Sequence, residues 1–87
     1  MKHTIQQLDA AINAANFKAN SDWQAAINAL NCLDNGNSAL IQVNNVQLGT
    51  LARAMQVETD KNENNYSLTF ENNGVVVILQ TQIISNK

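Results

Sequence analysis

A seven-residue segment that occurs twice near the start of the chain constrains its fold more than any other feature. Residues 10–16 (AAINAAN) and 25–31 (AAINALN) differ at one position and are offset by fifteen residues. In both copies the apolar residues recur at the spacing of an α-helix. Asn20 and Ser21 separate the copies, and residues of these types favour helix ends. We therefore predict that residues 1–35 form two antiparallel helices packed against a common core.

Two helix starts are marked by the spacing of hydroxyl and amide residues. Thr4 precedes Gln7 by three positions, and Ser21 precedes Gln24 by three. This is the capping-box arrangement, in which each side chain bonds a free backbone N–H of the other residue. Gly36 suits the left-handed position that ends the second helix. The residues predicted to face the core are Ile5, Leu8, Ile12 and Ala15 in the first helix and Trp23, Ile27 and Leu30 in the second, with Ala26 beside them.

The second half of the chain alternates between strand and helix patterns. Residues 39–43 form a short apolar run typical of a strand. Asn44 and Asn45 can cap a third helix over residues 46–57. The face of this helix predicted to be buried consists of Leu48, Leu51, Ala52 and Met55.

A β-hairpin is predicted near the end of the chain. Polar and apolar residues alternate over 66–70, which indicates a half-buried strand, and residues 75–79 are all apolar. Between them, Asn73-Gly74 favours a tight turn, because both central turn positions need positive φ. The pairs that this turn would bring together on one side of the sheet are Phe70 with Val77 and Leu68 with Leu79.

These elements predict a single α+β domain over residues 1–87 with the order ααβαββ. The helical hairpin and the third helix would pack on a small, mainly antiparallel, three-stranded sheet that ends in the β-hairpin. Three helices can cover one face of such a sheet but hardly both, so Val76, Ile78 and Ile84 would remain on the second face. The alternative is that the second helix wraps around to that side. An uncovered apolar face is typical of an association surface, including a homodimer interface through the sheet.

Composition argues against several classes of function. Charged residues make up 14% of the chain and the net charge is −2, which does not favour binding to nucleic acid. We find no run of 18 apolar residues and no signal-like start, so we expect a cytoplasmic protein that does not enter a membrane. Cys32 is the only cysteine, which excludes a disulfide within the chain, and we expect it to be a small core residue.

The residues that could carry catalysis or bind a metal form no recognisable set. His3 is the only histidine, and we expect it to be solvated beside the start of the chain. The carboxylates lie outside apolar runs that would raise their pKa, so they are expected to be surface acids. With three glycines, the chain has no phosphate-binding loop motif. We therefore predict no enzyme activity, no cofactor and no metal.

A calcium site is one alternative to the absence of a metal. Asp60, Asn62, Asn64 and Glu71 match the ligand spacing of a calcium loop, with Asn65 where glycine is expected. A calcium loop should lead into a second helix, whereas the residues that follow this segment alternate like a strand. We therefore predict an ordinary solvated connection from residue 60 to residue 65.

A weak nucleic-acid-binding regulator is the second alternative. The third helix and the Asn73-Gly74 hairpin can be drawn as the helix and wing of a winged-helix domain. Such a domain needs a recognition helix before the wing and several cations to neutralise phosphates. Here Arg53 and Lys61 are accompanied by Glu58, Asp60 and Glu63, so binding to a polyanion would be weak.

The function that remains is that of a non-enzymatic protein-binding module. We expect a small inhibitor, immunity or adaptor protein of bacterial or phage type that acts by occupying the surface of a partner protein. Small size, few charges and amide-rich helix surfaces support this hypothesis. The contact residues are expected among the exposed positions of the third helix and the last strand, namely Arg53, Gln56, Gln80 and Gln82.

Overall fold

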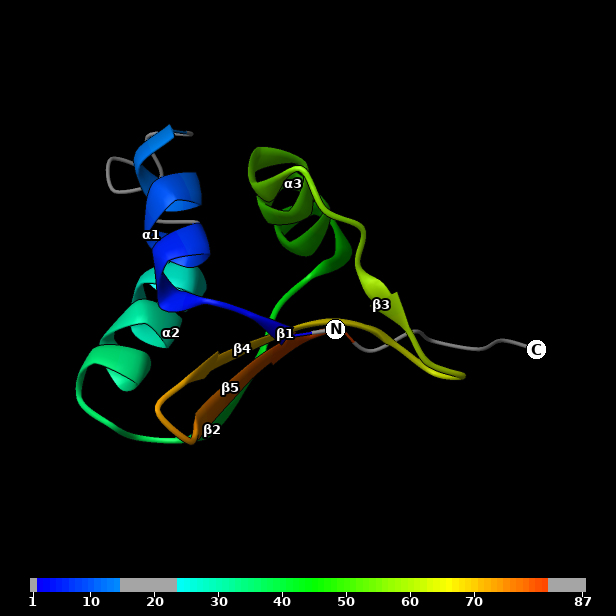
Figure 1. Ribbon diagram of the computed structural model, residues 1–87. Coiled ribbons are helices and arrows are strands. Elements are labelled where there is room, and N and C mark those ends of the chain that lie inside the picture. The colour runs from blue at the N-terminus through cyan, green and yellow to red at the C-terminus, as the bar shows by residue number, and fades with distance from the viewer. Residues whose placement is uncertain (1, 15–23, 82–87) are drawn as a thin grey trace.

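The computed structural model describes residues 2–14 and 24–81 (Figure 1). Three helices and a mixed sheet with a C-terminal hairpin confirm the predicted α+β class. The elements, in chain order, are β1 (Lys2–His3), α1 (Ile5–Ala14), α2 (Gln24–Asp34), β2 (Ala39–Gln42), α3 (Asn45–Met55), β3 (Asp60–Lys61), β4 (Tyr66–Asn72) and β5 (Val75–Gln80).

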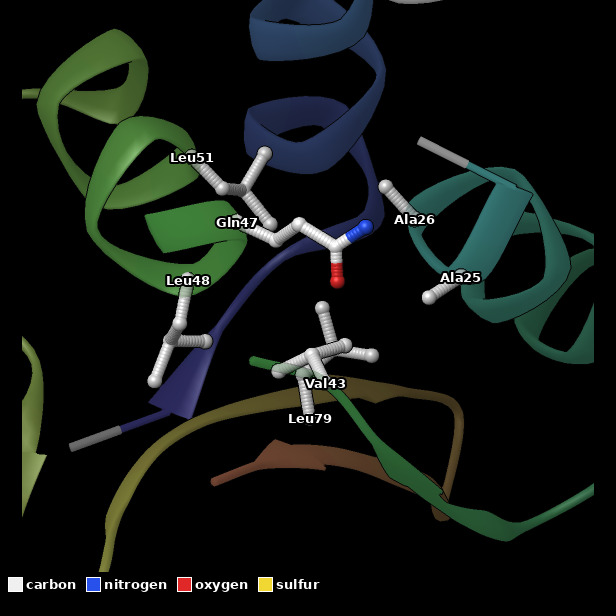
Figure 2. Close-up of a pocket in the computed structure, with 7 residues that line it drawn as sticks. All are labelled: Ala25, Ala26, Val43, Gln47, Leu48, Leu51 and Leu79. Atoms are coloured by element: carbon white, nitrogen blue, oxygen red, sulfur yellow. The ribbon is translucent and has the colours of Figure 1, made fainter. Parts of the chain in front are cut away.

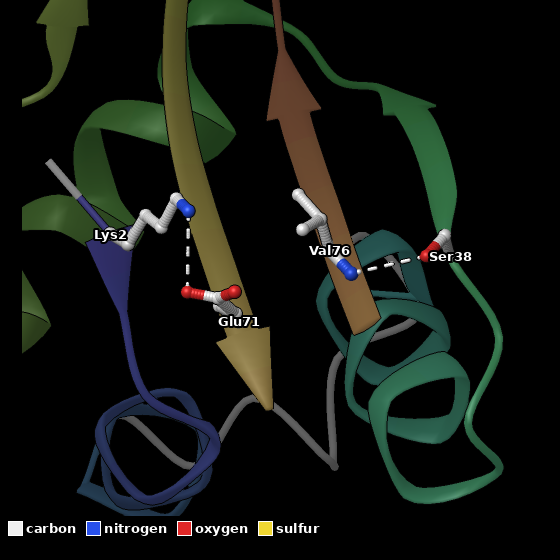
Figure 3. Close-up of polar contacts among 4 residues, drawn as sticks. All are labelled: Lys2, Ser38, Glu71 and Val76. Atoms are coloured by element: carbon white, nitrogen blue, oxygen red, sulfur yellow. Dashed lines mark hydrogen bonds and ion pairs between the residues drawn. The ribbon is translucent and has the colours of Figure 1, made fainter. Parts of the chain in front are cut away.

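The sheet differs from the prediction in strand number and direction. Its order is β1-β4-β5-β2, and β3 also pairs with β4, which makes five strands instead of three. The pairs β1–β4 and β2–β5 are parallel, while β3–β4 and β4–β5 are antiparallel. A crossover through α3 separates β2 from the hairpin, and such a connection allows parallel pairing. Just before β2, the Ser38 hydroxyl accepts a hydrogen bond from the Val76 N–H at 3.1 Å (Figure 3).

The two additional strands are two residues long, too short to produce a periodic pattern in the sequence. Lys2 and His3, which belong to the region predicted to form two helices, form β1. Residues 60 and 61, predicted to belong to a polar loop, form β3. The predicted first helix start is confirmed, because the Thr4 N–H donates to Gln7 Oε1 at 2.8 Å and the Gln7 N–H donates to Thr4 Oγ1 at 3.2 Å. Ser21 of the second predicted capping box lies outside the described residues.

All three helices lie on one side of the sheet, and α1 and α2 run in opposite directions (Figure 1). The hairpin register confirms the two predicted pairs, Leu68 with Leu79 and Phe70 with Val77, and these four side chains are buried beneath the helices. From α1 and α3 the buried apolar residues include Leu8, Ile12, Leu48, Leu51 and Ala52, as predicted. The core thus lies between one face of the sheet and one layer of helices.

The buried stripe of α2 is shifted from the predicted one. Ala26, Ala29 and Leu33 are buried, whereas Ile27 and Leu30 are only half-buried. Alanine side chains let a helix approach its neighbours closely, so α2 turns its small residues toward the core. Trp23 and Ala15, both predicted to be buried, lie outside the described residues.

Both α2 and α3 end with a residue in the left-handed conformation. After α2 this residue is Gly36, at φ +77°, as predicted. After α3 it is Gln56, at φ +61°, where the side chain makes this conformation unfavourable. The Asn37 N–H bonds the Cys32 carbonyl at 2.8 Å, and the N–H of residue 57 bonds the carbonyl of residue 52 at 3.0 Å. Both ends therefore have the hydrogen bond that defines a Schellman motif.

Replacing Gln56 by glycine should stabilise the protein by up to about 1 kcal/mol, because glycine adopts positive φ without steric cost. Gln56→Ala is the matched control, since it removes the side chain but keeps the strained conformation. The Gly36→Ala variant should lose about 1 kcal/mol, although a Cβ there would meet no atom within 4 Å. Urea denaturation of the four proteins measures these differences. A Gln56→Gly protein less stable than Gln56→Ala would contradict this account.

Candidate functional site

Strand β2 forms one edge of the sheet. It pairs with β5 on one side, and on its other side no strand lies among residues 2–14 and 24–81. The opposite edge is divided between the two-residue strands β1 and β3, which both pair with β4. An edge strand presents backbone N–H and C=O groups that a further strand can bond. The edge of β2 is therefore the longer one that a partner strand can use.

The hydrogen bonds of β2 indicate which of its backbone groups point outward. The Val43 N–H donates to the Gln80 carbonyl oxygen at 2.9 Å, so Val43 directs its backbone groups toward β5. Because this direction alternates along a strand, Leu40 and Gln42 direct their N–H and C=O groups to the open edge. An added strand would bond these two residues first.

The uncovered face of the sheet has an apolar half and a charged half. Leu40 lies beside Ile78 in the register of β2 and β5 and is 55% exposed, whereas Ile78 and Val76 are half-buried. Toward the opposite edge, Lys2 Nζ lies 3.3 Å from Glu71 Oε1 (Figure 3). Leu40 is the only exposed large apolar side chain on the described strands, and it lies on the open edge. Ile84, the third residue predicted on this face, lies outside the described residues.

Charge is distributed unevenly between the two edges. The chain has five basic and seven acidic residues, but between residues 24 and 52 the only charged one is Asp34. That segment contains α2, β2 and most of α3. The opposite edge carries Lys2, Asp60 and Lys61. Proteins usually protect edge strands from pairing by charges or proline, and β2 has neither.

The three predicted contact residues that the structure describes are not brought together. Arg53 and Gln56 belong to α3 and its C-terminal end, on the side of the sheet that the helices cover. Gln80 follows the buried Leu79 in β5, so its side chain points to the other face. Gln82 lies outside the described residues. Arg53 and Gln56 therefore do not share one surface with Gln80.

Leu40 is the residue that sequence reasoning missed. The strand containing it was predicted, but a strand pattern does not reveal whether the strand is central or lies at an edge. The absence of charge and proline around it was the available signal. That signal becomes informative only once β2 is known to be an edge, because a central strand has the same composition.

The expectation that His3 is solvated is wrong. Its side chain is 3% exposed and packs on Phe70, with ring centroids 5.9 Å apart and an angle of 55° between the rings. Pairing of β1 with β4 holds His3 beside Phe70. The pKa of His3 is lowered, mainly because the ring is buried. The Asp60 carboxylate raises this pKa in part, and the N-terminal ammonium group lowers it further. Its Nε2 atom is buried without a hydrogen-bond partner among the described residues.

The segment with calcium-loop spacing forms part of a hairpin. Asp60 lies opposite Ser67 in the pairing of β3 with β4. Glu71 is four residues further along β4, or about 13 Å at the usual rise per residue, and forms the ion pair with Lys2. Asp60 and Glu71 therefore lie too far apart to hold one cation.

The other side chains that could bind a metal or take part in catalysis do not lie together. Within the described parts of the chain, no group of three or more His, Cys, Asp or Glu side chains is arranged to hold a metal ion. Cys32 is half-buried and packs against the core cluster, as predicted for a small core residue.

A small apolar cleft lies between α2, α3 and the sheet (Figure 2). The side chain of Gln47 extends across it, and its Oε1 accepts the Asn44 N–H at 3.3 Å as part of the α3 cap. About 10 Å³ of the cleft can be occupied by water, which is room for at most one molecule. The cleft is therefore a packing feature between elements. Its lining residues are Ala25, Ala26, Val43, Gln47, Leu48, Leu51 and Leu79.

The helix and hairpin considered for nucleic-acid binding are not arranged as a helix and wing. Strands β4 and β5 form the centre of the sheet, with β1 and β3 on one side and β2 on the other. The hairpin tip lies near the end of α2 in Figure 1, away from α3. The hairpin is thus held within the sheet and does not project beside α3.

Comparisons with models of known protein families, with curated proteins and with solved structures found no match to this chain. None of the helices that the structure describes is long and apolar enough to cross a membrane.

We expect the stability of the protein to decrease as the pH falls from 7.5 to 5.5. The pKa of His3 is lower in the folded protein than its ordinary value of 6.5, so the buried neutral ring contributes its full stability above pH 6.5. That contribution is lost as the pH falls below this value, because the unfolded chain binds the proton more tightly. His3→Phe keeps a ring against Phe70 but cannot titrate, so its stability should depend less on pH. Urea denaturation at both pH values tests this, and equal losses in the two proteins would contradict it.

Proposed function

We propose that this chain is a cytoplasmic, non-enzymatic protein-binding module that receives a β-strand of its partner at the open edge of β2. In this proposal the partner strand lies along β2 and bonds the outward N–H and C=O groups of Leu40 and Gln42. Strand addition of this kind obtains affinity from backbone hydrogen bonds and specificity from side chains on alternate positions. An inhibitor or adaptor that occupies a partner's surface can act in this way without catalysis.

One observation carries the proposal: an unprotected edge strand with an exposed leucine. Leu40 is 55% exposed at the edge. In the sequence, the nearest charged residue before it is Asp34 and the nearest after it is Arg53. Exposed edges without charge, proline or a covering element pair readily with other strands. The opposite edge, with Lys2, Asp60 and Lys61, supplies a contrast within the same sheet.

The site differs from the one expected from sequence. The proposed contacts are centred on β2, whereas Arg53 and Gln56 lie on α3 and at its C-terminal end. Gln80 lies beside Gln42 in the register of β2 and β5, one strand in from the edge. The cytoplasmic location is supported only by composition: the chain has one cysteine and no internal pair that an oxidising compartment would stabilise.

Affinity capture with matched variants tests the proposal. The tagged chain, its Leu40→Lys variant and its Val46→Lys variant are incubated with nuclease-treated lysate of the cells that produce the protein. Val46 is 75% exposed but belongs to α3, so lysine there controls for the added charge. We expect a protein partner to be retained by the wild-type chain and by Val46→Lys, and at least tenfold less by Leu40→Lys. Equal retention by all three proteins would exclude the β2 edge as the binding site.

A further inference from the structure

We propose that a second copy of this chain pairs with the β2 edge, so that two sheets join across a two-fold axis at Leu40. This inference rests on the proposed function, because it uses the same open edge and specifies its partner. The two β2 strands would run antiparallel, and each copy would contribute the same residues to the contact. Such an isologous contact is the commonest form of symmetric protein association.

The backbone geometry of β2 permits this pairing. In an antiparallel pair, residues that lie opposite each other either both point toward the partner strand or both point away. With the axis at Leu40, the outward groups of Leu40 face those of Leu40 in the second copy. Gln42 then lies opposite Ser38 of the second copy. By the same alternation, the backbone groups of residue 38 also point away from β5. The register therefore satisfies the outward N–H and C=O groups of Leu40 and Gln42.

The side chains of β2 favour contact with the same side chains of a second copy. Side chains at directly opposite positions of an antiparallel pair have Cβ atoms about 5 Å apart, so the two Leu40 side chains would meet on the uncovered face. Leu40 is 55% exposed in the single chain, so this contact would remove apolar surface from water. Another register, with the axis at residue 41, would place Leu40 opposite Gln42 and lose the apolar contact.

The distribution of charged residues favours this edge for contact between identical copies. The chain has a net charge of −2, so two copies repel each other weakly over most approaches. Across β2 this repulsion has no local source, because residues 35–52 carry no charge. Helix α2 packs on β5 and β2 and so lies closest to the same edge, and its only charge is Asp34 at its end. The opposite edge carries Lys2, Asp60 and Lys61, and charges of this kind protect edge strands from pairing.

The small size of the contact predicts a reversible dimer. Strand β2 has four residues, and an interface built on it falls at the low end of known interface areas, below about 1,200 Å² in total. We therefore expect monomer and dimer to exchange, with the dimer dominant only at high protein concentration.

Sedimentation equilibrium of the purified full chain, from about 5 to 500 μM, tests the inference. We expect the apparent mass to rise from that of a monomer toward that of a dimer. Leu40→Lys and Leu40→Glu should each weaken dimerisation at least tenfold, because like charges would lie opposite each other. Val46→Lys should dimerise like the wild-type chain. Circular dichroism shows whether each variant remains folded.

Mixing the two charged variants tests the register itself. If Leu40 lies opposite Leu40, a mixture of Leu40→Lys and Leu40→Glu should form a heterodimer although neither variant dimerises alone. A mixture that stays monomeric, or a Leu40→Lys protein that dimerises like the wild-type chain, overturns the pairing at Leu40. A wild-type chain that is monomeric at every concentration overturns self-pairing alone. The capture experiment, performed on dilute protein, then decides separately whether another protein's strand uses the edge.

Discussion

The burial of one sheet face beneath a single layer of helices is the constraint on which the rest of the structure depends. The tight turn at Asn73-Gly74 sets the hairpin register, with both turn residues at positive φ. That register places Leu68 and Phe70 beside Leu79 and Val77, all four fully buried. Because side chains alternate along a strand, the same register directs every other residue to the uncovered face. The fold therefore has one core and one open face.

An open face and an open edge have different consequences. On the face, Val76 and Ile78 are half-buried by their neighbours in the sheet, and the Lys2–Glu71 ion pair makes the far half polar. On the edge, the backbone groups of Leu40 and Gln42 have no partner strand among the described residues. Water satisfies exposed backbone groups as it does exposed polar side chains, but only the edge presents a row of N–H and C=O groups that a further strand can bond. This difference is why the proposed contact is centred on the edge of β2 rather than on the whole face.

Features set by neighbours in the sequence could be predicted, and features set by distant neighbours could not. The Thr4–Gln7 cap, the Gly36 helix end and the hairpin register each depend on a few adjacent residues, and the structure confirms them. The burial of His3 depends on pairing with residue 70, far along the chain, so its place at the start of the chain was misleading. The edge position of β2 likewise depends on strand order, which similar apolar runs do not encode. The site was missed for the same reason.

Hydrogen exchange of the β2 amides, followed by NMR at low and high protein concentration, tests the central claim most directly. The Val43 N–H donates to β5 in the single chain, so its exchange should be slow at both concentrations. The Leu40 and Gln42 amides should exchange rapidly in dilute protein and become protected as the concentration rises. Exchange of these two amides that is slow in dilute protein, or equally rapid at both concentrations, would contradict an open edge that pairs with a second copy.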